Sequence, residues 1–248
     1  TRNLYKNLRG TKIIFEEINH DLNLEFSYQW NVSDKYGFIK KSKLINKNID
    51  NINIRILDGV QNILPWGLEQ PTQNNTSNLV DAYKRGELEV KSGVGIFALS
   101  SIIVDKAEPS EALKASVAWS LGFKTSQKLL SSLQLKKFRE EGLINQEVDV
   151  KAEKGAYFIN TEVNLKSGEE KKWLICADVN KTSADIISLS NEITNNKNLE
   201  HGVDADIQNA SDELYKLTGS SDGLQTSSDK RRNIRHFSNT LFNIMRGG

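Results

Sequence analysis

Hydrophobic and polar side chains alternate along most of the first 180 residues. In the segment 24–30 (LEFSYQW) every second residue is apolar, and this period of two predicts a half-buried strand. In 52–57 (INIRIL) the three isoleucines share one face, while Asn53, Arg55 and Leu57 share the other. Further strands are predicted at 12–18, 38–45, 94–104, 115–123, 156–165 and 172–179. Eight or more strands, many with one polar side, predict a mainly β protein built as an antiparallel sandwich or barrel.

Helical spacing replaces this alternation after residue 180, apart from one earlier stretch. That stretch, 129–141, carries apolar residues beside charged ones and has Gly142 as its predicted stop. Thr182-Ser183-Ala184-Asp185 fits a capping pattern for a helix that begins there. Three helices are predicted at 183–193, 204–217 and 229–245. We therefore divide the chain into a β domain, residues 1–180, and a helical linker, residues 181–248.

The two last predicted helices differ in how they end and in what they bury. The helix 204–217 is predicted to stop at Gly219. The helix 229–245 carries an apolar stripe of Ile234, Phe237, Leu241 and Ile244, which Phe242 and Met245 widen. A helix that is apolar over much of its girth needs burial on more than one side. The stripe therefore predicts a further partner surface for the last helix.

Composition narrows the function classes. The chain has 248 residues, and its formal net charge is 33 − 32 = +1. This balance argues against a nucleic-acid partner, which usually needs a large basic surface. No apolar run approaches the roughly 18 residues that cross a bilayer, so no membrane partner is expected. The single cysteine, Cys176, permits no internal disulfide and is interpreted as a buried strand residue.

Candidate chemistry is sparse. No two of the three histidines, His20, His201 and His236, have metal-ligand spacing, so we expect neither a metal nor a cofactor. His236 is the best candidate for a polar role because it adjoins Arg231, Arg232 and Arg235, although a solvated basic helix face is the simpler interpretation. The sequence contains no P-loop. The obvious carboxylate pairs are Glu16–Glu17, Asp105 with Glu108, and Glu140–Glu141, and each is interpreted as solvated surface. We therefore predict no catalytic residues.

The segment 57–83 has no clean period but is dense in amides, glycine, proline and aromatic residues. Aromatic rings that stack on a sugar, with amides that bond its hydroxyls, are the groups a carbohydrate site uses. The candidate residues for such a site are Trp66, Tyr83, Gln61, Asn62 and Asn75. The alternative is a long loop folded on itself, whose amides cap its own backbone.

Three stretches carry a resemblance to a known family. They are 54–65 (IRILDGVQNILP), 75–84 (NTSNLVDAYK) and 236–248 (HFSNTLFNIMRGG), and 156–158 and 177–180 fit the same pattern. With them, nearly the whole chain resembles bacterial proteins described as cellobiose-phosphorylase-like. The resemblance implies an antiparallel β-supersandwich of the galactose-mutarotase-like type, followed by linker helices and an (α/α)6 catalytic domain.

The resemblance also shapes the expected function. It places the catalytic carboxylate beyond Gly248, and a chain that starts at Thr1 with Met245 as its only methionine fits a piece of a longer protein. We expect a non-catalytic domain that packs on the active site of the downstream domain, with a cytoplasmic location. The expected partners are that domain, a carbohydrate, and a second copy of this chain in a homodimer.

Two alternatives stay open. One is a free-standing carbohydrate-binding module with Trp66 and Tyr83 as stacking platforms. The other is an aldose-epimerase-like enzyme that uses Glu or Asp on a concave sheet. Aldose mutarotases use histidines there, and His20 is the only histidine of the predicted β domain.

Overall fold

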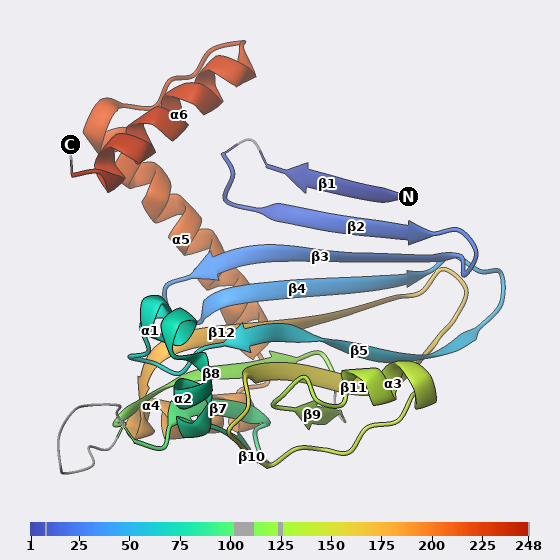
Figure 1. Ribbon diagram of the computed structural model, residues 1–248. Coiled ribbons are helices and arrows are strands. Elements are labelled where there is room, and N and C mark those ends of the chain that lie inside the picture. Colours follow the sequence, from blue (N-terminus) through green and yellow to red (C-terminus); the bar gives the residue numbers. More distant parts are fainter. Residues whose placement is uncertain (8, 102–111, 124–125, 248) are drawn as a thin grey trace.

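Two antiparallel sheets of unequal size form the body of the protein, and helices follow at the C-terminal end (Figure 1). The computed structural model describes residues 1–7, 9–101, 112–123 and 126–247. The last part of the predicted strand 94–104 and the pair Asp105 and Glu108 lie outside the described residues. The fold is mainly β with C-terminal helices, as the alternation predicted. The division at residue 180 into two domains stays a prediction, although the last strand does end at Thr182.

The large sheet has nine strands. In their order across the sheet, they are β1 (Arg2–Lys6), β2 (Ile13–Asn19), β3 (Leu24–Ser33), β4 (Gly37–Asn46), β12 (Glu170–Thr182), β8 (Lys114–Leu121), β7 (Val94–Leu99), β6 (Lys84–Glu89) and β10 (Asp149–Lys151). The small sheet contains β5 (Ile52–Ile63), β11 (Gly155–Leu165) and β9 (Gln127–Leu129). Some neighbouring strands are far apart in the sequence: β4 pairs with β12 although more than a hundred residues separate them. The strand order therefore depends on long-range pairing and not on hairpins alone.

The main core lies between the two sheets. The large sheet contributes buried Phe97 and Trp173, and the small sheet contributes Tyr157 and Ile159. The isoleucines of β5 pack against this core, which confirms the face that their spacing predicted. Asn53 and Arg55 lie on the opposite, outer face of the small sheet.

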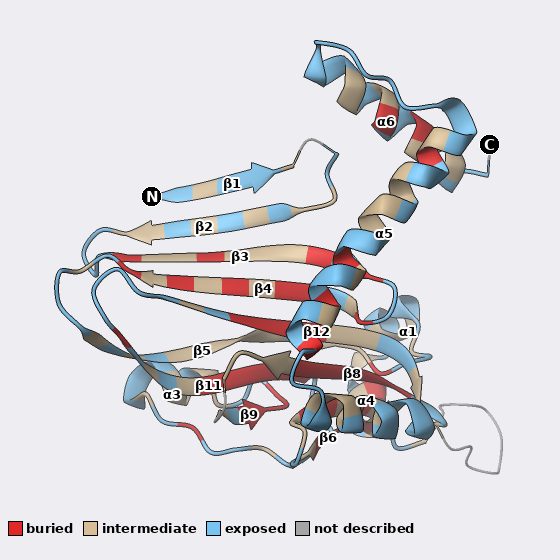
Figure 2. Ribbon diagram, turned by 180° about the vertical axis from the view of Figure 1, so that it is seen from behind, coloured by how far each residue is buried: buried red, intermediate tan, exposed pale blue. Residues whose placement is uncertain are grey.

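A second core covers the other face of the large sheet (Figure 2). Here α4 (Ser183–Asn195) and α5 (Leu199–Asp222) pack on buried residues that include Trp119 and Cys176. The predicted capping pattern is confirmed, because Thr182 accepts from the backbone N–H of Asp185 and Asp185 bonds back to Thr182. The last helix, α6 (Lys230–Met245), begins after Asp229, whose carboxylate accepts from two backbone N–H groups of its first turn.

Several predicted bounds are wrong for identifiable reasons. The segment 57–83 is no long loop: β5 continues to Ile63, and α1 (Gln70–Asn75) and α2 (Ser77–Tyr83) follow. Polar Asp58 and Gly59 interrupt the alternation inside β5. Asp58 bonds to the large sheet, and a Cβ on Gly59 would meet the carbonyl oxygen of Tyr157 at 2.3 Å.

The helical bounds differ as well. In the stretch 129–141 only α3 (Leu135–Glu141) is helical, because Leu129 ends strand β9 and is buried under α3. Gly142 ends α3 in the left-handed region, φ 67°, as predicted. Gly219 does not stop α5, which runs to Asp222 with Gly223 at its end. Packing of the C-terminal part of α5 on α6, where Tyr215 contacts Phe237, outweighs the modest intrinsic cost of an internal glycine, about 1 kcal/mol.

Candidate functional site

Two of the predicted sugar-binding residues sit at a β-bulge near the end of β5. Asn62 has no partner in the register of β5 with β11 and adopts the left-handed region, φ 58°. Asparagine tolerates this conformation better than most residues. Gln61 is exposed and donates from Nε2 to Oγ of Ser132 over 3.0 Å. The Gln61 amide therefore has a local partner, and Asn62 has a local backbone role at the bulge.

The other three candidates lie further along the chain. The indole of Trp66 is 40% exposed, and Nζ of Lys114 lies 6.0 Å from its ring centroid. Asn75 is the exposed last residue of α1, and Tyr83 ends α2 half-buried. Within the described structure, no hydrogen bond joins any two of the five candidates. A sugar site made by these residues stays a prediction.

A buried ion pair joins the two sheets, and sequence patterns did not indicate it. Lys40 of β4 and Asp58 of β5 form a salt bridge with side chains only 9% and 11% exposed. Oδ2 of Asp58 also accepts from Oγ of Ser42 over 3.0 Å and from the indole Nε1 of Trp173 over 2.8 Å. Nζ of Lys40 additionally contacts the carbonyl oxygen of Gly59 over 3.3 Å. With its oxygens already bonded to three partners, this carboxylate serves as a structural link.

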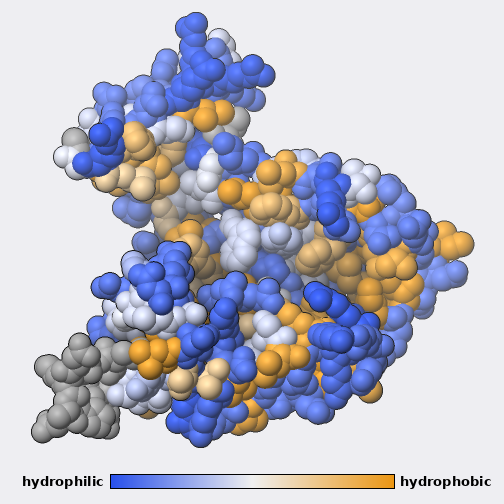
Figure 3. Space-filling view, viewed as in Figure 1, coloured by the Kyte–Doolittle hydropathy of each residue, from blue (hydrophilic) through white to orange (hydrophobic). Residues whose placement is uncertain are grey.

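An exposed apolar surface is the second feature that only the structure reveals. It extends the inner face of the large sheet beyond the edge of the small sheet, and we call it the open face. Its members, identified by strand register and alternation, are Leu4, Ile13, Phe15, Tyr28, Trp30, Val32 and Phe38. Hydrophobic residues gather over this side of the molecule in Figure 3.

Burial falls steadily along one row of this face. The row runs through directly paired residues from Trp173 of β12 through Ser42 and Tyr28 to Phe15 and Leu4. Trp173 is 2% exposed, Phe15 is 38% exposed and Leu4 is 65% exposed. Phe15 and Tyr28 stack with ring centroids 5.0 Å apart. The open face is thus a continuation of the core that the small sheet does not reach.

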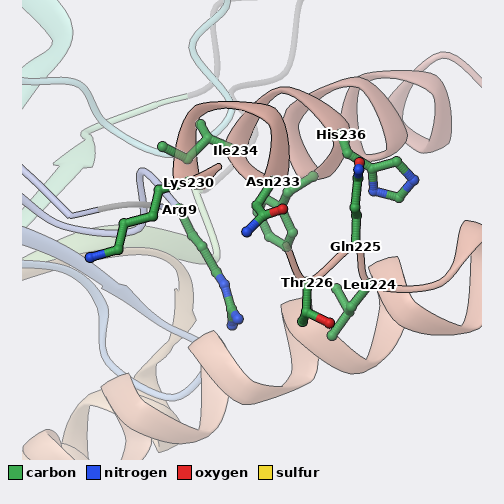
Figure 4. A pocket seen from close by; sticks show the side chains of 9 residues that line it. Arg9, Leu224, Gln225, Thr226, Lys230, Asn233, Ile234 and His236 are labelled. Carbon is green, nitrogen blue, oxygen red and sulfur yellow. The ribbon is translucent and has the colours of Figure 1, made fainter. Parts of the chain in front are cut away.

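A pocket of about 110 Å³ lies where the β1–β2 connection meets the last two helices (Figure 4). Figure 4 shows Arg9 reaching in from the sheet side, while Asn233 and His236 approach from α6. The guanidinium of Arg9 lies 3.8 Å from the ring centroid of Tyr215, which itself packs edge-on against Phe237. The pocket therefore marks a contact that holds the helices to the sheet.

The basic helix face predicted around His236 is solvated at its arginines but not at the histidine itself. The neighbouring arginines, Arg231, Arg232 and Arg235, are exposed, as a solvated basic face predicts. His236 itself turns toward α5, with Nε2 3.4 Å from Oδ2 of Asp222 and a buried Nδ1 that has no partner in the described structure. Its role is a helix–helix contact.

Two further chemical candidates are Cys176 and the carboxylate pair Glu16–Glu17. Cys176 is fully buried, and burial raises the pKa of its thiol, which makes the thiolate inaccessible at neutral pH. Glu16 accepts from Asn3 and Tyr5, and these bonds hold the pKa of its carboxyl below the usual range. Glu17, the next residue along β2, pairs with Arg2. The two carboxylates therefore point to opposite faces of the strand and form no catalytic pair.

Comparison with known proteins yields structural likeness only. No family model and no curated protein sequence matches the chain. A solved structure described as a kojibiose phosphorylase from the human microbiome aligns over 94% of this chain and 27% of its own, at 11% identity and a TM-score of 0.42. Heparinase III aligns over 75% of this chain and 22% of its own, at 12% identity and a TM-score of 0.40. A galactose mutarotase-like protein from Clostridium acetobutylicum aligns over 73% of this chain and 65% of its own, at 9% identity and a TM-score of 0.29.

These likenesses are coarse. The chain spans about a quarter of the length of the phosphorylase and of heparinase III. TM-scores of this size carry no argument about fold or activity. Within the described residues, no helix combines the length and the apolar character needed to cross a membrane.

Proposed function

We propose that this chain is a non-catalytic β domain of a carbohydrate-active protein, and that its open face packs on a catalytic domain of the same polypeptide. The observation that carries the proposal is the open face itself. It is contiguous with the main core, yet Val32 and Phe38, paired across β3 and β4, are 56% and 60% exposed. Extended apolar surface of this kind usually marks a contact with another protein surface.

The candidate chemistry supports a non-catalytic role. Asp58 is the best-buried carboxylate near the open face, and its oxygens are engaged by Lys40, Ser42 and Trp173. A general acid or nucleophile needs access to substrate, which this arrangement denies. The epimerase alternative, with a carboxylate on the sheet surface, gains no support from this geometry.

An activity assay on two proteins tests the proposal. The 248-residue chain and the complete gene product are each offered α-linked and β-linked disaccharides, with and without inorganic phosphate. We expect sugar or sugar phosphate to be released only by the complete product. Turnover by the 248-residue chain alone would overturn the non-catalytic role.

A second experiment tests the docking surface. Phe38→Ser in the complete product should lower its activity and its melting temperature, because the interface loses an apolar contact. Ile49→Ser is the matched control, since Ile49 is 91% exposed outside the open face. Equal effects of the two variants would contradict docking through this face. A 248-residue chain that dimerises in solution, and loses its dimer on Phe38→Ser, would instead assign the open face to a second copy.

A further inference from the structure

Strand β5 forms one edge of the small sheet, and it is long for an edge strand. In the described structure the two sheets have four edges, formed by β1 and β10 in the large sheet and by β5 and β9 in the small one. β1 has five residues, and β9 and β10 have three each, whereas β5 has twelve. Proteins usually keep edge strands short or cover them, because unpaired backbone groups pair readily with another chain. A long free edge therefore needs an explanation.

The pairing of β11 identifies the backbone groups of β5 that point to this free edge. The N–H of Ala156 donates to the carbonyl oxygen of Leu130, directly after β9, over 2.9 Å. Backbone groups alternate along a strand, so the even-numbered residues of β11 bond toward β9 and the odd-numbered ones toward β5. The odd-numbered residues of β5, up to Gly59, stand opposite even-numbered residues of β11. The N–H and C=O groups of Arg55, Leu57 and Gly59 therefore point away from β11.

One of these groups places the free edge above the large sheet. The carbonyl oxygen of Gly59 accepts from Nζ of Lys40 over 3.3 Å, which agrees with its outward direction. Lys40 belongs to β4, and Ser42 of the same strand bonds to Asp58, so β5 lies above β4. Adjacent strands are about 4.8 Å apart in any sheet, so a strand added to β5 would lie above β3. Figure 1 shows β1, β2 and β3 extending beyond β5.

The two faces of β3 are buried in the reverse order of their polarity. Asn31 and Ser33, on the face toward α5, are 2% and 3% exposed. On the opposite face, Tyr28 and Trp30 are only half-buried and Val32 is 56% exposed. Apolar side chains are normally the more buried ones. A strand above β3 would cover these residues and restore the usual order.

A second copy of the chain fits this edge poorly. Two β5 strands paired antiparallel in a symmetric dimer are related by a two-fold axis perpendicular to the small sheets. Both large sheets then lie on the same side of the joined small sheets. Because β1–β3 extend beyond β5 in each copy, the two sets of strands would occupy the same space. The geometry favours a single extended segment instead.

We propose that an extended segment of the catalytic domain proposed above adds to the small sheet as a strand beside β5. Its backbone bonds to the free groups of Arg55, Leu57 and Gly59, and its alternate apolar side chains contact Tyr28 and Trp30. A strand satisfies the edge and covers the open face at once, which a helix would not. The inference rests on the proposed function for the source of the segment, and it specifies how that domain contacts the open face.

Hydrogen–deuterium exchange of the 248-residue chain and of the complete gene product tests the added strand. In the chain alone, the amides of Arg55, Leu57 and Gly59 should exchange fast, and those of Ile54 and Ile56, which face β11, should exchange slowly. In the complete product the first three should exchange about tenfold more slowly, the effect of one added hydrogen bond each. Unchanged fast exchange of these amides in the complete product would overturn the proposal.

A proline variant tests the backbone contact directly. Arg55→Pro removes an amide that no strand of the described structure uses, and proline is tolerated at such edge positions. Arg55→Ala is the matched control, because it loses the same contacts to Gly142 and Glu162 but keeps the amide. The two variants of the 248-residue chain should melt at similar temperatures. In the complete product Arg55→Pro should melt lower than Arg55→Ala, and equal melting temperatures there would contradict the added strand. The exchange experiment needs no variant, so it decides the matter even where Arg55→Pro does not fold.

Failure of the added strand is distinguishable from failure of the proposed function. If Phe38→Ser destabilises the complete product while the β5 amides still exchange fast, the open face docks without an added strand and only this inference is overturned. If the β5 amides of the 248-residue chain become protected as its concentration rises, the edge pairs with a second copy, which overturns the proposed occupant. Turnover by the 248-residue chain alone would overturn the non-catalytic role and leave the added strand intact.

Discussion

The indole Nε1 of Trp173 donates a 2.8 Å hydrogen bond to Oδ2 of Asp58, and this bond joins the large sheet to the small one. Lys40 forms a salt bridge with the other oxygen of the same carboxylate. The core between the sheets thus contains a polar centre whose charges are paired. Such a centre stabilises one alignment of the two sheets, because sliding them apart would leave a buried charge without its partner.

Removal of the Asp58 carboxylate should be strongly destabilising. Asp58→Ala leaves the buried ammonium of Lys40 unpaired, and we expect a loss of about 3–5 kcal/mol in the free energy of unfolding. Urea unfolding followed by circular dichroism measures it. Asp21→Ala, at an exposed position in the β2–β3 turn, is the control and should cost less than about 0.5 kcal/mol. Similar losses of unfolding free energy in the two variants would show that the ion pair between the sheets does not stabilise the fold.

Lys128 should make stability depend on pH in the alkaline range. Burial lowers the pKa of its ammonium to about 8, so between pH 8 and about 10.5 the unfolded chain binds more protons than the folded one. The free energy of unfolding should therefore rise across this window, by at most about 3 kcal/mol, and fall back as the pH drops through 8.

Lys128→Met tests that dependence. Methionine keeps the side-chain length without the charge, so the rise between pH 8 and 10.5 should shrink and stability at pH 7 should increase. Thermal melts across the pH range give the comparison. Parallel profiles for the two proteins would assign the pH dependence to other groups.

Gly59 is required because strands β5 and β11 approach each other closely at this position. A Cβ at this position would lie 2.3 Å from both the carbonyl oxygen of Tyr157 and Cδ1 of Phe158. Gly59→Ala should cost about 3 kcal/mol or more, since the backbone of β11 would have to move. Gly168→Ala isolates the effect of conformation, because Gly168 has φ 71° with open space around it, and should cost about 1 kcal/mol. The reverse order in denaturant unfolding would contradict the steric explanation.

Two aspartates on α5, Asp206 and Asp204, should differ in how much they contribute to the stability of the fold. Asp206 accepts from Oγ of Ser33 and from the backbone N–H of Lys35 at 3.1 Å, and so it joins α5 to the β3–β4 turn. Asp206→Ala should cost about 1–3 kcal/mol. Asp204 forms an ion pair with Lys41 nearer the solvent, and Asp204→Ala should cost less than about 1 kcal/mol. Thermal melts that rank Asp204→Ala as the more damaging change would refute this assignment.

The helical end of the chain was largely predictable because its signals are local. Thr182 and Asp185 are three residues apart and bond to each other, so the start of α4 follows from residues within one turn. Asp229 likewise bonds to the first turn of α6. The end of α5 was not predictable from Gly219, because this part of the helix packs on α6, where Tyr215 lies edge-on against Phe237.

The second half of β5 shows why other elements escaped sequence reasoning. Asp58 is an inward-facing polar residue, and its partners Lys40 and Trp173 lie 18 and 115 positions away. A pattern of alternation treats such a residue as an interruption. Gln61 and Asn62, interpreted as candidate sugar ligands, lie at a bulge in β5, and Nε2 of Gln61 donates to Ser132; their role as sugar ligands stays a prediction.

The sequence by itself determined that the protein is mainly antiparallel β with C-terminal helices, because side-chain periodicity and capping act over a few residues. Only the tertiary structure decided which surfaces stay uncovered. The open face exists because the small sheet ends before β1–β3. Its extent depends on strand pairings between distant segments, whose free energies are set by contacts that no local pattern records.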